Sequence, residues 1–110
     1  MKLKELVPPV ELCKQIPEGE FAGSVFVYFY DANGQNITLD QREGDAIWKD
    51  VVLAPAPTLE EIMASFSYCR VYKKSSGKFI ACRNKFREVA ENGATAALQL
   101  WLKVKGGDDE

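Results

Sequence analysis

The sequence SVFVYFY, from Ser24 to Tyr30, is the strongest strand signal in this chain of 110 residues. Every position after the serine is β-branched or aromatic, and such side chains favour extended backbone. Both alternating faces of this strand are therefore apolar. A strand of that kind lies in the centre of a sheet or turns one face toward a partner.

Hairpin signals follow this strand on its C-terminal side. The segment Asp31–Gly34 has the composition of a turn, because asparagine and glycine accept positive φ angles. The segment Gln35–Asp40 then predicts a returning strand with Ile37 and Leu39 facing inward. The apolar segment Ala46–Leu53 is a candidate for a third strand.

Two helices are indicated by their starting residues and by apolar spacing. A proline pair precedes a short helix over Val10–Ile16, since proline suits the first position of a helix. The proline-rich segment Ala54–Pro57 predicts a break in structure. Thr58 and Glu61 then match the capping box, so a second helix begins there.

A second hairpin is predicted by the strand-like segments Ser67–Lys74 and Lys78–Phe86, which flank Ser75–Gly77. We assign Ser75 and Ser76 to a two-residue loop, which places Cys69 opposite Cys82. The face predicted to join the core carries Cys69, Val71, Ile80, Cys82 and Phe86. The face predicted to meet solvent carries Tyr68, Arg70, Tyr72, Phe79, Ala81, Arg83, Lys85 and Arg87. A shift of one residue would mix these two sets, so their clean separation favours this register.

The last segment completes an α+β pattern. Asn92 caps a third helix whose apolar stripe includes Trp101. Hairpins joined by helices predict an antiparallel sheet of four or five strands, built from two hairpins, with three helices packed on it. A chain of 110 residues forms one domain, residues 1–110, with residues 106–110 expected to be a flexible acidic tail.

Charge is distributed unevenly along a chain whose net charge is only −2. Residues 18–61 contain nine acidic and two basic residues, a net charge of −7. Residues 67–87 contain seven basic residues and no acidic one, a net charge of +7. The second hairpin is therefore a cationic block in an otherwise acidic protein.

Composition argues against several classes of function. The chain has no histidine, which removes the usual general base near neutral pH and the commonest transition-metal ligand. Three separated cysteines without a C-x-x-C pair indicate reduced, buried thiols. The chain begins without a signal-like apolar segment and contains no run long enough to span a membrane. We therefore expect a cytoplasmic protein with no enzymatic activity, no catalytic residue, no cofactor, no metal site and no membrane partner.

Three segments together resemble a known group of small proteins. They are Val7–Lys14, Ala56–Ile62 and Ala96–Lys103. In this order and spacing they are similar to small proteins without an established activity that recur in phage and prophage regions of gut bacteria. The chain departs from that pattern at Asn92-Gly93, where Asn-Pro is expected. The resemblance implies an accessory protein in the cytoplasm of a bacterial host, and it carries over no catalytic residue.

The second hairpin is the candidate site, and its function stays open among several hypotheses. The leading hypothesis is a protein-binding module whose surface recognises an acidic protein. The second is single-stranded DNA or RNA binding, because aromatics between cations stack on bases and contact phosphates. A third reading is structural: the aromatics are buried and the bases pair with the acidic first half. Self-association as a homodimer is also consistent with the sequence. The binding residues predicted for the first two hypotheses are Tyr68, Arg70, Tyr72, Arg83, Lys85 and Arg87.

Overall fold

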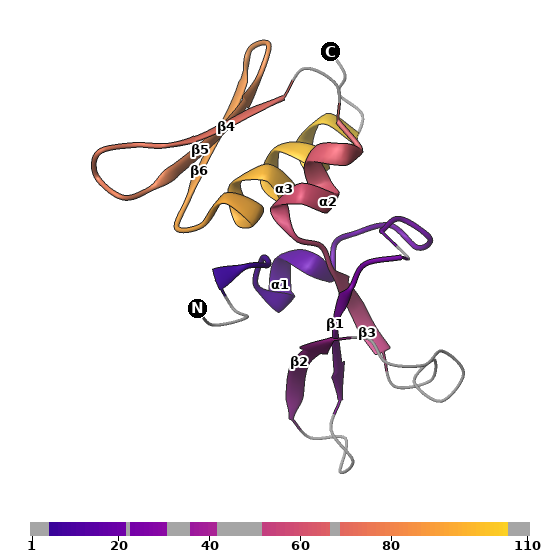
Figure 1. Cartoon of the computed structure of the whole chain (residues 1–110). Helices are drawn as coiled ribbons and strands as arrows, with labels where there is room; N and C mark the ends of the chain where they lie inside the picture. The colour runs from indigo at the N-terminus through magenta and orange to yellow at the C-terminus, as the bar shows by residue number, and fades with distance from the viewer. Residues whose placement is uncertain (1–4, 22, 31–35, 42–51, 67–68, 106–110) are drawn as a thin grey trace.

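A computed structural model describes residues 5–21, 23–30, 36–41, 52–66 and 69–105 (Figure 1). In these ranges the chain is α+β, with three helices and two antiparallel sheets of three strands each. The helices are α1 (Val10–Cys13), α2 (Leu59–Ala64) and α3 (Gly93–Lys103). The strands are β1 (Phe26–Tyr30), β2 (Ile37–Gln41), β3 (Val52–Ala56), β4 (Arg70–Lys73), β5 (Phe79–Arg83) and β6 (Phe86–Ala90). The predicted α+β class is confirmed, but the prediction of a single antiparallel sheet of four or five strands is not matched, because the described residues form six strands in two separate sheets.

The first sheet has the order β2-β1-β3, so the strand signal at Ser24–Tyr30 becomes its central strand. The predicted break at Ala54–Pro57 is wrong over most of its length, because β3 begins at Val52 and ends at Ala56. Pro55 is tolerated because β3 is an edge strand, where a missing N–H costs no ladder bond on the outer side. The third strand therefore overlaps its predicted segment, Ala46–Leu53, only at the end, and residues 46–51 lie outside the described ranges.

The returning strand β2 differs from its prediction in one inward residue. Leu39 packs against the core, as predicted. Ile37 was predicted to face inward but is 41% exposed. It pairs with Tyr30 at the far end of β1, which is 40% exposed. The hairpin of β1 and β2 projects from the body of the molecule there, so this cross-strand pair lies beyond the reach of the core (Figure 1).

The second sheet has the order β4-β5-β6. The segment predicted as one strand, Lys78–Phe86, is two strands in the structure. β5 ends at Arg83, and the chain turns at Asn84, whose φ of 54° lies in the left-handed region that asparagine accepts more readily than most residues. β6 then returns antiparallel to β5. The second hairpin thus becomes a three-stranded meander.

The three helices begin where predicted, and α1 ends early. The capping box of α2 is confirmed, with the Thr58 side chain accepting from the Glu61 N–H and the Glu61 side chain accepting from the Thr58 N–H. Helix α1 ends at Cys13 rather than Ile16. The N–H groups of Gln15 and Ile16 instead bond to carbonyls three residues back, a tight turn that leads into the following proline.

Helix α3 starts on Asn92, whose side chain accepts from the N–H of Thr95 at 2.7 Å. Its first residue, Gly93, allows close approach to the neighbouring elements. A Cβ at Gly93 would lie 3.1 Å from Leu59 Cδ2 and 3.5 Å from Phe79 Cδ2. The glycine therefore sets how closely α2 and the second sheet pack on the start of α3.

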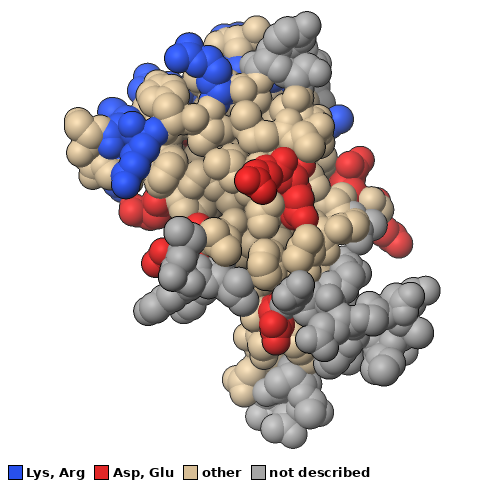
Figure 2. Space-filling view, viewed as in Figure 1, with Lys and Arg blue, Asp and Glu red and all other residues tan. Residues whose placement is uncertain are grey.

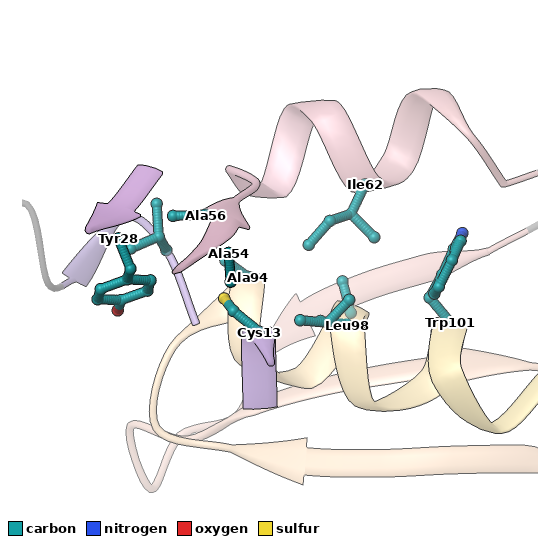
Figure 3. Packing of buried hydrophobic residues seen from close by; sticks show 10 residues of the cluster. Cys13, Tyr28, Ala54, Ala56, Ile62, Ala94, Leu98 and Trp101 are labelled. Carbon is teal, nitrogen blue, oxygen red and sulfur yellow. The ribbon is translucent and has the colours of Figure 1, made fainter. Parts of the chain in front are cut away.

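Helix α3 is the centre of the fold because it is buried on two sides. One side joins the larger cluster, in which Ala94, Ala97, Leu98 and Trp101 pack with α1, α2 and the first sheet (Figure 3). The other side, Ala96 and Leu100, packs on Ala81 of the second sheet. A helix that is apolar around most of its circumference is expected in the interior. One face of the β4–β6 sheet is therefore fixed on α3.

The junction between α1 and the first sheet contains two buried proton donors. The Tyr28 hydroxyl donates to the Pro8 carbonyl at 2.6 Å, and the Cys13 thiol donates to the same oxygen at 3.6 Å. Burial raises the pKa of Cys13 to about 12. Burial, with a smaller effect of Cys13, raises the pKa of Tyr28 to about 12. Both groups are therefore neutral donors at ordinary pH, and the bond from Tyr28 ties the N-terminal segment to β1.

Candidate interaction surface

The register of the second sheet decides which side chains lie on each face. Lys74 donates its N–H to the Lys78 carbonyl at 2.7 Å, and Gly77 donates to the Lys74 carbonyl at 2.9 Å. The loop therefore has three residues, Ser75–Gly77, with Gly77 at a φ of 96°. A three-residue hairpin loop with glycine in the left-handed position is a common turn. The predicted two-residue loop is wrong.

The register shifts by one residue as a result. Arg70 lies opposite Cys82, and Tyr72 lies opposite Ile80. The faces of β4 are as predicted, with Val71 toward the core and Tyr72 away from it. The faces of β5 are reversed, because Phe79 and Ala81 pack on α3, whereas Ile80 and Cys82 occupy the other face. The proposed pair of Cys69 and Cys82 is not in register.

We call the face turned away from α3 the open face. Its side chains form three rows across the sheet, because residues opposite one another in a ladder share a face. The rows contain Tyr72, Ile80 and Val89 in the middle, Arg70, Cys82 and Arg87 on one side, and Lys74, Lys78 and Glu91 on the other.

The middle row of the open face is apolar. Tyr72 is 43% exposed and Val89 is 47% exposed, whereas Ile80 between them is only 1% exposed. Ile80 faces away from α3, and its cross-strand neighbours on this face are Tyr72 and Val89. Tyr72 and Val89 therefore present apolar surface to solvent on either side of Ile80.

The outer rows are mainly cationic. Lys78 is bound to Glu91 at 2.8 Å, and both side chains are exposed. Within the part of the chain that the structure describes, Arg70, Lys74 and Arg87 form no ion pair with a carboxylate. Arg70 lies 5.8 Å from the centre of the Tyr72 ring, which places its guanidinium beside the apolar row.

The structure places only three of the six predicted binding residues on the open face. Arg70, Tyr72 and Arg87 share the open face. Arg83 belongs to the face toward α3, where its guanidinium lies 5.6 Å from the centre of the Phe66 ring. Lys85 sits in the turn between β5 and β6, so neither of these two is on the open face. Tyr68 lies outside the described residues.

Sequence reasoning missed several residues of the open face. Ile80 and Cys82 were assigned to the core, Lys74 and Lys78 were counted in the cationic block without being assigned to a face, and Val89 was not assigned. The alternation in Phe86–Ala90 and the turn residue Asn84 were available signals for β6. Gly77 was the signal for the longer loop.

The bases of this region do not pair with the acidic first half in the ranges described. The ion pairs found there are Lys14 with Glu11, Lys78 with Glu91, and Lys103 with Glu88. Each joins two residues from the same half of the chain. Lys and Arg side chains gather over the β4–β6 end of the molecule, while Asp and Glu side chains lie mostly outside it (Figure 2).

The cysteines are all free thiols. Burial raises the pKa of Cys69, and the nearby Cys82 thiol raises it further, whereas Arg83 opposes this effect. The Cys69 thiol therefore differs from an activated nucleophile, whose pKa is lowered by nearby positive charge. Among the described Cys, Asp and Glu residues, no group of three lies together as a metal site would require.

A cavity of about 720 Å³ opens at the end of the second sheet, beside the start of α2 and α3. Leu59 and Phe79 are among its apolar lining residues, and Glu5, Glu60 and Glu91 contribute carboxylates. Its charge is thus opposite to that of the open face. The protein therefore has two surfaces of opposite charge, the cationic open face and the cavity lined by carboxylates.

No family model matches this chain, and neither a curated protein nor a solved structure matches it. In the portion that the structure describes, none of the helices is long and apolar enough to cross a membrane.

Proposed function

We propose that the protein is a small non-enzymatic binding module whose open face docks an acidic protein. The observation that carries this proposal is the apolar row of Tyr72 and Val89 between cations without carboxylate partners in the described chain. Apolar contact supplies affinity, and complementary charge supplies orientation and a faster encounter. The phage-related cytoplasmic setting that the sequence suggests remains a prediction.

The structure's arrangement of aromatics favours a protein over a nucleic acid as the partner. Stacking platforms for single-stranded bases require exposed rings. Phe79, expected on the solvent face, instead packs toward α3, which leaves Tyr72 as the aromatic side chain of the open face in the described ranges.

An affinity capture from bacterial lysate with a matched control tests the proposal. The test variant is Arg70→Glu with Arg87→Glu, both on the open face. The control is Lys14→Glu with Lys105→Glu, which changes the net charge by the same amount. Lys14 lies at the end of α1 and Lys105 lies beyond the end of α3, so neither is on the open face. Circular dichroism confirms that both variants fold.

We expect at least one acidic protein to be retained by the wild type and by the control, and to be lost from the test variant. Retention must survive nuclease treatment. If the test variant retains the same proteins as the wild type, the open face is not the binding surface. If retention disappears with nuclease, the partner is a nucleic acid and the proposal fails.

A further inference from the structure

The size of the open face limits what can bind it. A five-residue strand is about 17 Å long, and three strands span about 10 Å, so the flat area is on the order of 200 Å². A stable interface between two folded proteins buries about 800 Å² on each partner. The open face alone therefore suits a short segment of a partner better than a folded domain.

The spacing of the rows matches an extended chain. Successive rows lie two residues apart along each strand, which is about 6.8 Å. An extended segment places every second side chain on one side at the same interval. Three alternate side chains of one segment can therefore meet the three rows in turn.

The chemistry of the rows then specifies those three side chains. The central one meets Tyr72 and Val89 and must be apolar or aromatic. The outer two meet cations, which are Arg70 and Arg87 at one end and Lys74 at the other. Arginine binds carboxylates through two parallel hydrogen bonds, which makes the Arg70 and Arg87 end the stronger one.

At the other end, Lys78 is already bound by Glu91 at 2.8 Å. An incoming acid there meets Lys74 together with the Glu91 carboxylate, which repels it. The two ends of the open face thus differ in strength, and this difference can be measured.

We propose that the open face binds an extended segment with the pattern acidic–x–apolar–x–acidic, laid along β5. This inference rests on the proposed function and names the class of segment recognised. Main-chain ladder bonds are not required, since the segment lies on the face of the sheet rather than along an edge.

Nuclear magnetic resonance titration with synthetic peptides tests the pattern, because it detects weak binding. The probe is acetyl-Glu-Thr-Phe-Thr-Glu-amide. The matched control peptide is acetyl-Glu-Glu-Phe-Thr-Thr-amide, which has the same composition and charge with the acids adjacent. A third probe is a short oligothymidylate.

We expect the alternating peptide to shift amide resonances of Arg70, Tyr72 and Val89, and to leave those of Val25 and Ile37 unchanged. Its Kd should be at least fivefold lower than that of the control peptide. Arg70→Glu with Arg87→Glu should raise Kd at least tenfold, and Lys74→Ala should raise it about two- to threefold. Lys14→Glu with Lys105→Glu should stay within twofold of the wild type.

Other outcomes overturn the inference in distinguishable ways. Equal binding of the two peptides means general attraction of acids, so the pattern is wrong while the proposed function stands. If neither peptide binds, but retention of a captured protein still depends on Arg70 and Arg87, the inferred segment pattern is wrong and the proposed function stands. Tighter binding of the oligothymidylate than of either peptide rejects both proposals. If diluting the protein alone shifts the same amide resonances, the open face binds a second copy of this chain. The inference of a peptide segment is then wrong.

Discussion

Glu61 joins two parts of the fold that lie far apart in the sequence. One carboxylate oxygen accepts from the Thr58 N–H at 2.9 Å and closes the capping box of α2. The other oxygen accepts from the Val25 N–H at 3.0 Å, immediately before β1. Replacing Glu61 therefore removes one of the two capping-box bonds, and with it a link between α2 and the first sheet, while the Thr58 side chain still accepts from the backbone N–H of residue 61.

The expected magnitudes differ between two substitutions. Loss of a helix cap costs about 0.5–2 kcal/mol, and a hydrogen bond to a charged group contributes about 1.5–3 kcal/mol. The bond to Val25 is solvent-exposed, so we assign it about 1 kcal/mol, below that range. Glu61→Ala should thus lower the free energy of unfolding by about 1.5–3 kcal/mol. Glu61→Gln keeps one acceptor oxygen and should cost about 1 kcal/mol.

Urea unfolding followed by circular dichroism measures these differences. Glu60→Ala is the matched control, since Glu60 is an exposed acid in the same first turn, and it should cost less than about 1 kcal/mol. The expected loss of unfolding free energy is largest for Glu61→Ala, smaller for Glu61→Gln and smallest for Glu60→Ala. If Glu61→Ala costs no more than Glu60→Ala, the link between α2 and β1 does not stabilise the fold and the reasoning is refuted.

Three further outcomes are expected. Tyr28→Phe removes a buried hydrogen bond and should cost about 1–3 kcal/mol in urea unfolding. Because the pKa of Tyr28 is raised from 10.0 to about 12, its neutral form contributes stability below pH 10 that is lost as the pH rises through 12, and Tyr28→Phe should flatten that part of a pH–stability curve. Leu100→Ala leaves a cavity between α3 and the second sheet and should cost about 2–5 kcal/mol, measured by thermal unfolding. Arg83→Glu loses the contact with Phe66 and should cost about 1–2 kcal/mol in urea unfolding. Arg70→Glu loses the more exposed contact with Tyr72 and should cost less, about 0.5–1 kcal/mol; equal costs would show that the two arginines have the same surroundings.

The sequence was sufficient for the elements that local chemistry determines. The cap at Thr58, the cap at Asn92 and the central strand of the first sheet all follow from residue type and spacing. The C-terminal part of β3 was missed because Pro55 and the following Pro57 signal a break, and only the position of β3 beside β1 shows that Pro55 is tolerated. Tertiary context overrode local propensity there.

The candidate site depended on one loop length, which local signals left ambiguous. A loop of two residues at Ser75–Ser76 separates polar from apolar residues cleanly, and so it was preferred. The structure uses Gly77 as a third loop residue, and this reverses the faces of β5. Ile80 illustrates why the pattern misled: it is buried although it faces away from α3.

A nuclear Overhauser spectrum of the wild-type protein tests the central claim, the sidedness of the β4–β6 sheet, most directly. The account predicts contacts of the Ile80 methyl groups with the Tyr72 ring and with the Val89 methyl groups, and contacts of the Ala81 methyl group with Leu100. Contacts between Ile80 and Leu100 would instead place Ile80 against α3, and the open face described above would not exist.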